Sequence, residues 1–299
     1  MKYFTTTAAL LTAGLMVGGT AQGTVLIDDD FDNGDIATGG INGGFGLITN
    51  GAGVAGSIGE AGTDATLTSG GGTIVSSNNI GITSNNSFDI SSQSEGIVVT
   101  YVVSSVDATP SIEVQGPEPG DPSTFQGFKT TSFWIDNDQN FDFTEGLFAV
   151  AVSDGSPAIG PGDVRIFIDS PEPGASVKII AGAGAITFDD STIDDGYTVK
   201  TTLTPDGWSV EFIGLGSLTN NSSSATVTSN VISAAWGTDA DDANYSNIFD
   251  STAYVAALQQ APLANSATID RITVEAVPEP GSLALLALGG VACLRRRRG

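Results

Sequence analysis

The sequence has 299 residues, of which 34 are acidic and only ten are basic, so the formal net charge is −24. Histidine is absent, which excludes Ser-His-Asp triads, histidine-based acid–base catalysis and the usual zinc sites. The strong negative charge argues against nucleic acid and anionic lipid as partners and favours divalent cations.

Residues 1–23 have the pattern of a secretory signal peptide. Lys2 supplies the positive charge, and an apolar stretch follows it. Gly19 and Ala21, or Ala21 and Gly23, place small residues at −3 and −1 of a possible cut. A buried N-terminal helix is the alternative, but the polar, Gly-rich sequence that follows favours a signal. We therefore expect an exported chain whose main domain begins at residue 24.

The body of the chain is rich in Gly, Thr, Ser and Asn and poor in helix-forming residues, which favours strands joined by turns. The Gly-rich segment 39–72 is interpreted as loops between short early strands, with a flexible linker as the alternative. Eleven strands without helical alternation predict an all-β, two-layer antiparallel β-sandwich for residues 24–276. The predicted strands are residues 24–28, 72–77, 96–106, 128–135, 146–153, 163–169, 175–182, 197–204, 207–215, 224–232 and 268–276.

The segment "WIDNDQNFDF" is a candidate calcium loop. Its oxygen-bearing side chains fall at alternate positions, as suits a loop curling around a hard cation: Asp136, Asp138, Asn140 and Asp142. The spacing resembles the opening of an EF-hand or dockerin loop. It departs from that pattern at Phe141, where glycine is needed, and at Leu147, where a bidentate acid is needed. A solvated acidic turn between two strands is the alternative.

The clearest local unit is a β-hairpin over residues 197–215. Tyr197, Val199, Thr201 and Leu203 share one face of the first strand. Pro205-Asp206-Gly207 supplies the turn, with Pro set for its second position and Gly for a positive φ. Trp208, Val210 and Phe212 share one face of the return strand. Trp208 and Trp134 both lie in alternating strands, and we expect them in the sandwich core.

A third tryptophan, Trp236, lies in a long polar connection together with Tyr245. An exposed aromatic ring beside acids and amides is the minimum that stacking on a sugar requires, so these two residues are candidate glycan contacts. The alternative for Trp236 is also a place in the core. Residues 247–261 are predicted as the one helix, capped by Asp250 or Ser251 and ended by Pro262.

The two edges of the domain resemble a known family. The sequences "LIDDDFDNGD" and "IDRITVEA" are similar to the paired terminal strands of concanavalin A-like (laminin-G type) jelly rolls, and "LTPDGWSVEFIGL" resembles a hairpin of their exported bacterial members. This resemblance implies that the first and last strands pair. It also implies a second possible calcium group near these strands, with exposed turn charges as the alternative: Asp28, Asp29, Asp30, Asp32, Asp35 and Asp270.

Residues 277–299 form a three-part C-terminal signal. Val277, Pro278, Glu279 and Pro280 precede an apolar run, Ser282–Leu294, which contains the only cysteine. As a helix this run spans about 20 Å, short of a hydrocarbon core of about 30 Å. Four arginines then follow, which the positive-inside rule keeps in the cytoplasm: Arg295, Arg296, Arg297 and Arg298.

This arrangement resembles the PEP-CTERM domain of exported proteins in exopolysaccharide-producing Gram-negative bacteria. The resemblance implies recognition by an exosortase, a membrane Cys protease/transpeptidase, with processing near the Pro-Glu-Pro. An ordinary tail anchor is the alternative. We expect a chain anchored transiently in the inner membrane and then sorted to the cell envelope or extracellular matrix.

Three functions remain open at this stage. The first is a non-enzymatic β-sandwich that binds glycan or builds the exopolysaccharide matrix, with Ca²⁺ as its only expected cofactor. The second is a polysaccharide-cleaving hydrolase or lyase on the same fold, which needs two acids about 5–10 Å apart; no such pair stands out. The third is a passive surface-layer protein that calcium stabilises.

Overall fold

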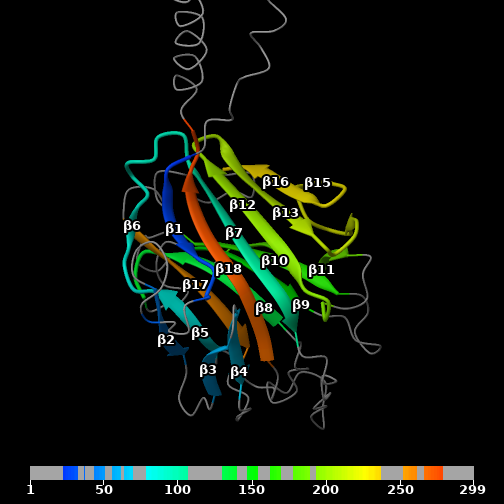
Figure 1. The fold of residues 1–299 in the computed structure, drawn as a ribbon. Coiled ribbons are helices and arrows are strands. Elements are labelled where there is room, and N and C mark those ends of the chain that lie inside the picture. Colours follow the sequence, from blue (N-terminus) through cyan, green and yellow to red (C-terminus); the bar gives the residue numbers. More distant parts are fainter. Residues whose placement is uncertain are drawn as a thin grey trace, which may run out of the picture.

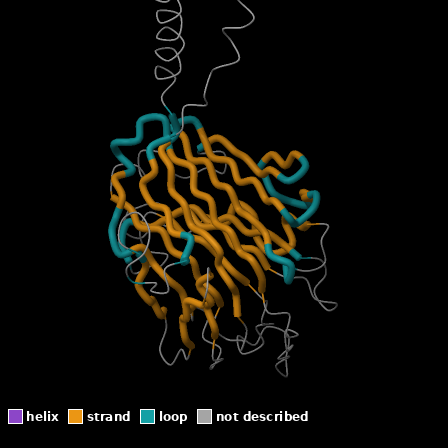
Figure 2. The backbone as a smooth tube through the Cα atoms, in the orientation of Figure 1, coloured by secondary structure: helices purple, strands orange, loops and turns teal. Residues whose placement is uncertain are grey.

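The computed structural model describes a β-rich body and leaves the two ends of the chain outside it. Every regular element in the described part is a strand, as Figure 2 shows. The predicted signal peptide up to residue 22, the strand predicted at 72–77 and the sorting helix Ser282–Leu294 lie outside the described residues. The described residues are 23–32, 37, 44–50, 56–61, 64–69, 79–106, 130–139, 147–153, 162–169, 178–188, 193–236, 252–260 and 266–278.

Nine strands form the first sheet, which we call sheet I (Figure 1). Neighbouring strands are antiparallel, and β1 (Val25–Asp29) joins the sheet by pairing with β18. The other strands are, in spatial order, β15 (Thr226–Thr228), β16 (Val231–Ala235), β13 (Gly207–Ile213), β12 (Tyr197–Thr204), β7 (Ile97–Val106), β18 (Ser266–Ala276), β4 (Asp64–Ser69) and β3 (Gly56–Ala61).

Nine further strands form sheet II, which lies behind sheet I in Figure 1. Neighbours are again antiparallel, and β6 (Phe88–Asp89) pairs with one end of β17. The spatial order is β14 (Leu218–Asn220), β11 (Lys178–Phe188), β10 (Asp163–Asp169), β9 (Leu147–Ser153), β8 (Thr130–Asp136), β17 (Thr252–Gln260), β5 (Asn79–Ser84) and β2 (Phe45–Asn50).

The core lies between the two sheets, because each strand turns every second side chain toward the other sheet. In β7 and β12 the buried residues alternate with more exposed ones. Aromatic rings pack against one another between the two sheets. The ring centroids of Tyr101 and Phe133 lie 6.2 Å apart, and those of Phe148 and Trp208 lie 5.7 Å apart, edge to face. The prediction of a two-layer antiparallel β-sandwich is confirmed.

The predicted hairpin is confirmed, with one correction to its turn. Strands β12 and β13 pair from Thr198↔Ile213 to Thr204↔Gly207, and Trp208 is buried in the core. Gly207, however, does not have the predicted positive φ. A Cβ at Gly207 would overlap the carbonyl oxygen of Ala234 on β16. Glycine is needed there because a third strand approaches closely, which the hairpin sequence alone does not reveal.

The terminal strands pair as predicted. Asp28 of β1 is in register with Thr273 of β18, and Asp29 with Ile272. On its other edge β18 pairs with β7 along nearly its whole length. The last predicted strand of the domain therefore lies inside sheet I, between the first strand and a central one.

The helix predicted for residues 247–261 is wrong, because residues 252–260 form the central strand β17. Ala253, Val255 and Ala257 face the core, while Ala256 and Leu258 are buried on the opposite face. A strand buried on both faces gives a continuous apolar run, and its periodicity cannot be told from that of a buried helix.

Two smaller expectations concern strands at the edges of the two sheets. Residues 224–232, predicted as one strand, form β15 and the start of β16, which reverse direction at Ser229, a residue with φ of 55°. The Gly-rich segment 39–72, interpreted as loops between short early strands, itself contains three of these strands, β2 in sheet II and β3 and β4 in sheet I.

Candidate functional site

The two sheets differ in the face that each turns away from the core. On sheet I this face is polar and partly exposed, with Lys200, Glu211 and Thr100 in one row across three strands. On sheet II it carries a second apolar group, separate from the core: Trp134, Ala149, Ala256 and Leu258. We call these four residues the outer cluster. Its four members are at most 5% exposed, so the accessible part of this face consists of the side chains packed at the margins of the cluster.

Strand register fixes how the outer cluster is arranged. Ala256, Trp134 and Ala149 are direct neighbours across β17, β8 and β9. Phe167 of β10 continues the row beyond Ala149. Trp134 is 5% exposed, whereas Phe167 and Tyr254 are only partly buried and pack against the cluster. The surface therefore consists of a buried tryptophan between small side chains, with two more accessible aromatic rings at its margins.

Trp134 is held in place by a hydrogen bond. Its indole Nε1–H donates to Ser132 Oγ over 2.7 Å, and Ser132 lies on the same face of β8. The sequence predicted Trp134 as a core residue. It is buried, but in the outer cluster rather than between the sheets.

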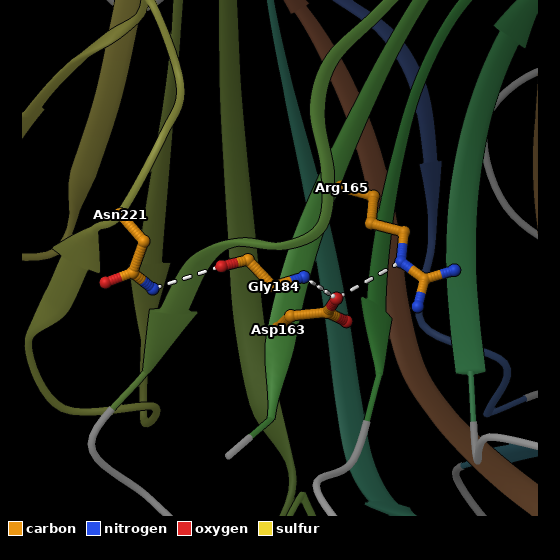
Figure 3. A network of polar contacts seen from close by, with 4 residues as sticks. All are labelled: Asp163, Arg165, Gly184 and Asn221. Carbon is orange, nitrogen blue, oxygen red and sulfur yellow. Dashed lines mark hydrogen bonds and ion pairs between the residues drawn. The ribbon is translucent and has the colours of Figure 1, made fainter. Parts of the chain in front are cut away.

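A polar network lies on the same face, at the β10–β11 side (Figure 3). Asp163 is 6% exposed, and its Oδ2 accepts hydrogen bonds from Gly184 N–H (2.7 Å) and Arg165 Nε–H (3.3 Å). Asn221 Nδ2 donates to Gly184 O (3.0 Å) and to Thr187 Oγ1 (3.3 Å). Gly184 has φ of +71° at the irregularity in β11. The network thus fixes an unusual backbone segment beside the aromatic row.

The buried carboxylates of this face are too far apart to act as a catalytic pair. Asp163 is in register with Ser153 of β9, which pairs with Thr130 of β8. Asp136, 1% exposed, lies six residues farther along β8, which corresponds to about 20 Å. Glycosidases place their two carboxyl groups about 5–10 Å apart. These two residues do not meet that requirement.

The candidate calcium loop is only partly described. Asp136 is the last residue of β8, and its Oδ1 accepts a hydrogen bond from Asn137 N–H over 2.6 Å. Asp138 is partly exposed. Asn140 and Asp142 lie outside the described residues, so calcium binding by this loop stays a prediction.

The acids of the terminal strands form ion pairs and hydrogen bonds within the protein. Asp28 makes a bidentate ion pair with Arg271, with distances of 2.8 and 2.7 Å. Asp29 is buried, and its Oδ1 accepts a hydrogen bond from Phe31 N–H. Within the described part of the chain, no group of three or more Asp or Glu side chains is placed to hold a metal ion. Asp35 lies outside that part.

Asp270 of this group has a raised pKa. Burial is the main cause, and the negative charge of Asp64 and a hydrogen bond with it add to the effect. The folded state therefore holds a proton on Asp270 more tightly than the unfolded chain does. Stability from this group is complete below the ordinary pKa of 3.8 and is lost as pH rises through the raised value.

We therefore expect Asp270→Asn to stabilise the protein in a pH-dependent way. The melting temperature of the variant should exceed that of the natural chain by an amount that grows as pH rises from 3.5 to 7, measured by thermal unfolding. Asp206→Asn, which removes one charge from the exposed hairpin turn, is the matched control. A pH-independent difference for Asp270→Asn would contradict the assignment.

Of the two predicted glycan contacts, only Trp236 is described. It is partly buried against the core, and its Nε1–H donates to Thr204 O over 2.7 Å at the end of the β12–β13 hairpin. Tyr245 lies outside the described residues. The sequence did not single out Phe167, and it offered Tyr254 only as one of several available aromatic residues, within a predicted helix. The signal for both is that β10 and β17 carry apolar residues on both faces.

The start of the predicted C-terminal signal is joined to sheet I. Ala276 N–H donates to Thr24 O and Val277 N–H donates to Gly96 O, both over 2.9 Å. Val277 and Pro278 are partly exposed, and the remaining signal residues from Glu279 to Arg298 lie outside the described part. Within the described residues, no helix has the length and apolar character to cross a membrane.

Comparison with solved structures finds similar β-rich proteins. The CBM2 module of an evolved Dit protein from Lactobacillus casei BL23 phage J-1 is 11% identical, with a TM-score of 0.48; 86% of this chain and 98% of that one are covered. A Bacillus subtilis protein of unknown function with a galectin-like fold is 12% identical, with a TM-score of 0.45 and coverage of 85% and 97%. The carbohydrate-binding module CBM66 from Bacillus subtilis is 12% identical, with a TM-score of 0.37 and coverage of 77% and 95%.

Comparison of the sequence gives one short and specific match. No curated protein matches the chain. The family model described as the PEP-CTERM protein-sorting motif matches residues 276–298. The predicted recognition of this motif is confirmed: the chain carries a PEP-CTERM sorting signal, which marks it for export and for sorting from the membrane.

Proposed function

We propose that this chain is an exported, exosortase-sorted β-sandwich that binds a neutral polysaccharide at the cell envelope or in the extracellular matrix, without cleaving it. The observation that carries the proposal is the apolar outer face of sheet II, with Phe167 and Tyr254 partly exposed at the margins of the outer cluster. Aromatic rings with adjacent polar groups are the usual means of holding a sugar ring.

The polar groups and the charge of the chain refine the ligand class. Arg165 lies on the same face as the two rings, is partly exposed, and supplies hydrogen-bonding groups near Phe167. The net charge of −24 repels acidic polymers at low salt, which favours a neutral polysaccharide. The wide spacing of Asp136 and Asp163 supports binding rather than hydrolysis.

The proposal is tested by affinity electrophoresis of the processed protein in gels that contain neutral or acidic polysaccharides, with calcium and then with EDTA. We expect a neutral polysaccharide to retard the protein. Tyr254→Ala and Phe167→Ala should each weaken the retardation about two- to twelvefold, because a stacked ring contributes about 0.5–1.5 kcal/mol. Ile213→Ala, which shortens a 50% exposed side chain on sheet I, is the matched control and should bind normally.

Other results would contradict the proposal in specific ways. Equal retardation of all three variants would place the binding surface elsewhere, and Trp236→Ala in the same gel tests the hairpin end of sheet I. If no polysaccharide retards the protein, the remaining hypothesis is that it is a structural component of the matrix. New reducing ends released from the polysaccharide would show cleavage. Loss of binding in EDTA alone would point to the Asp136–Asp138 loop.

A further inference from the structure

The sorting motif begins inside the sandwich. Its first residue, Ala276, is the last residue of β18 and is 9% exposed. Ala276 N–H is bonded to Thr24 on one side of β18, and Val277 N–H is bonded to Gly96 on the other side. The two residues that open the motif are therefore held from both flanks by backbone hydrogen bonds.

Close packing strengthens this attachment. A Cβ at Gly23 would overlap the carbonyl oxygen of Ala276, and a Cβ at Gly96 would overlap that of Leu203. Gly96 also has φ of +106°, which L-residues with side chains rarely adopt. The two glycines thus allow two close approaches at this end of sheet I, Gly23 to Ala276 of β18 and Gly96, just before β7, to Leu203 of β12.

The space left for an enzyme is small. Between Val277 and the apolar run that starts at Ser282 there are four residues, Pro278–Gly281. Fully extended, they span at most about 14 Å. A peptidase holds its substrate extended, with main-chain contacts on both sides of the cleaved bond. Several of the residues it would bind before the Pro-Glu-Pro are those already paired in sheet I.

We propose that this pairing limits access to the sorting motif, so that the membrane-embedded processing enzyme acts only after Ala276 and Val277 have separated from β1 and β7. The folded sandwich thereby slows its own release. Cleavage then breaks an amide C–N bond, joins the acyl carbon to the oxygen of water, and leaves a proton on the new amine. The rate depends on how often this end of sheet I opens.

The first test lengthens the full chain at two positions. Gly-Ser-Gly-Ser inserted between Val277 and Pro278 moves the Pro-Glu-Pro away from the sheet. We expect processing about tenfold faster in a pulse-chase experiment in a cell that exports and processes the chain, because two backbone hydrogen bonds no longer have to open. The same insertion between Gly281 and Ser282 is the matched control: it lengthens the tether equally but leaves the motif attached to the sheet.

The outcomes separate two explanations. Acceleration by the first insertion alone supports the proposal. Equal acceleration by both insertions would mean that distance to the membrane limits processing, and no acceleration by either would mean that access is not limiting; both results overturn the proposal.

A second measurement does not depend on the enzyme or on any variant. Hydrogen exchange of the unprocessed chain in detergent should show the amides of Ala276 and Val277 protected relative to that of Glu279. Equal exchange at all three positions would overturn the proposal.

Discussion

Replacing Phe31 with alanine should lower the free energy of unfolding by about 3–5 kcal/mol. Phe31 is fully buried, and its ring centroid lies 5.4 Å from that of Phe45. Its side chain belongs to the main core, although it stands in the most acidic stretch of the sequence. The substitution removes a large buried ring and leaves a cavity that surrounding strands cannot fill, because each is held by its neighbours.

Urea unfolding of the processed protein measures this effect. Ile213→Ala is the control, because that side chain is half exposed and should cost less than about 1 kcal/mol. A loss of less than 1 kcal/mol for Phe31→Ala would mean that Phe31 does not belong to the core. The backbone of Phe31, with φ of 53°, is set by the hydrogen bond from its N–H to Asp29 Oδ1.

Gly96→Ala should have a comparable effect, about 3 kcal/mol or more, for a different reason. The positive φ costs about 1–3 kcal/mol for a residue with a side chain, and the collision with Leu203 O adds the cost of moving β7 and β12 apart. We expect a lower urea midpoint with little change in the slope of the transition.

Gly46→Ala is the matched control for Gly96→Ala. Gly46 lies in β2, its φ is not positive, and a Cβ there would approach only the side-chain oxygen of Asn85, at 3.0 Å. Because that side chain can move, Gly46→Ala should change stability by less than about 1 kcal/mol. Equal losses in the two variants would contradict a special role for the backbone at Gly96.

The sequence predicted well those strands that have one buried face. Tyr197, Val199, Thr201 and Leu203 are all buried as their alternation indicates, and the hairpin turn lies at Pro205-Asp206. Strands with two buried faces were harder to predict from the sequence. In β17 the same apolar run satisfies a helix or a strand, and only pairing with β5 and β8 decides the outcome.

The candidate site depended even more on tertiary structure. Phe167 and Tyr254 are 87 positions apart in the sequence and meet the same cluster only because β10, β9, β8 and β17 are neighbours. The sequence also identified Trp134 as buried, but it could not assign the residue to a face. Local patterns identified the sorting motif completely, because that motif is defined by consecutive residues rather than by a fold.

The pairing of β1 with β18 has a consequence for the order of folding during export. Strand β18 contacts β1, β4 and β7, so the middle of sheet I is incomplete until the last strand of the domain has crossed the membrane. Contacts between such distant segments form slowly, because a long chain must close on itself. We therefore expect the domain to complete its folding only after β18 has been exported, so that folding competes in time with sorting.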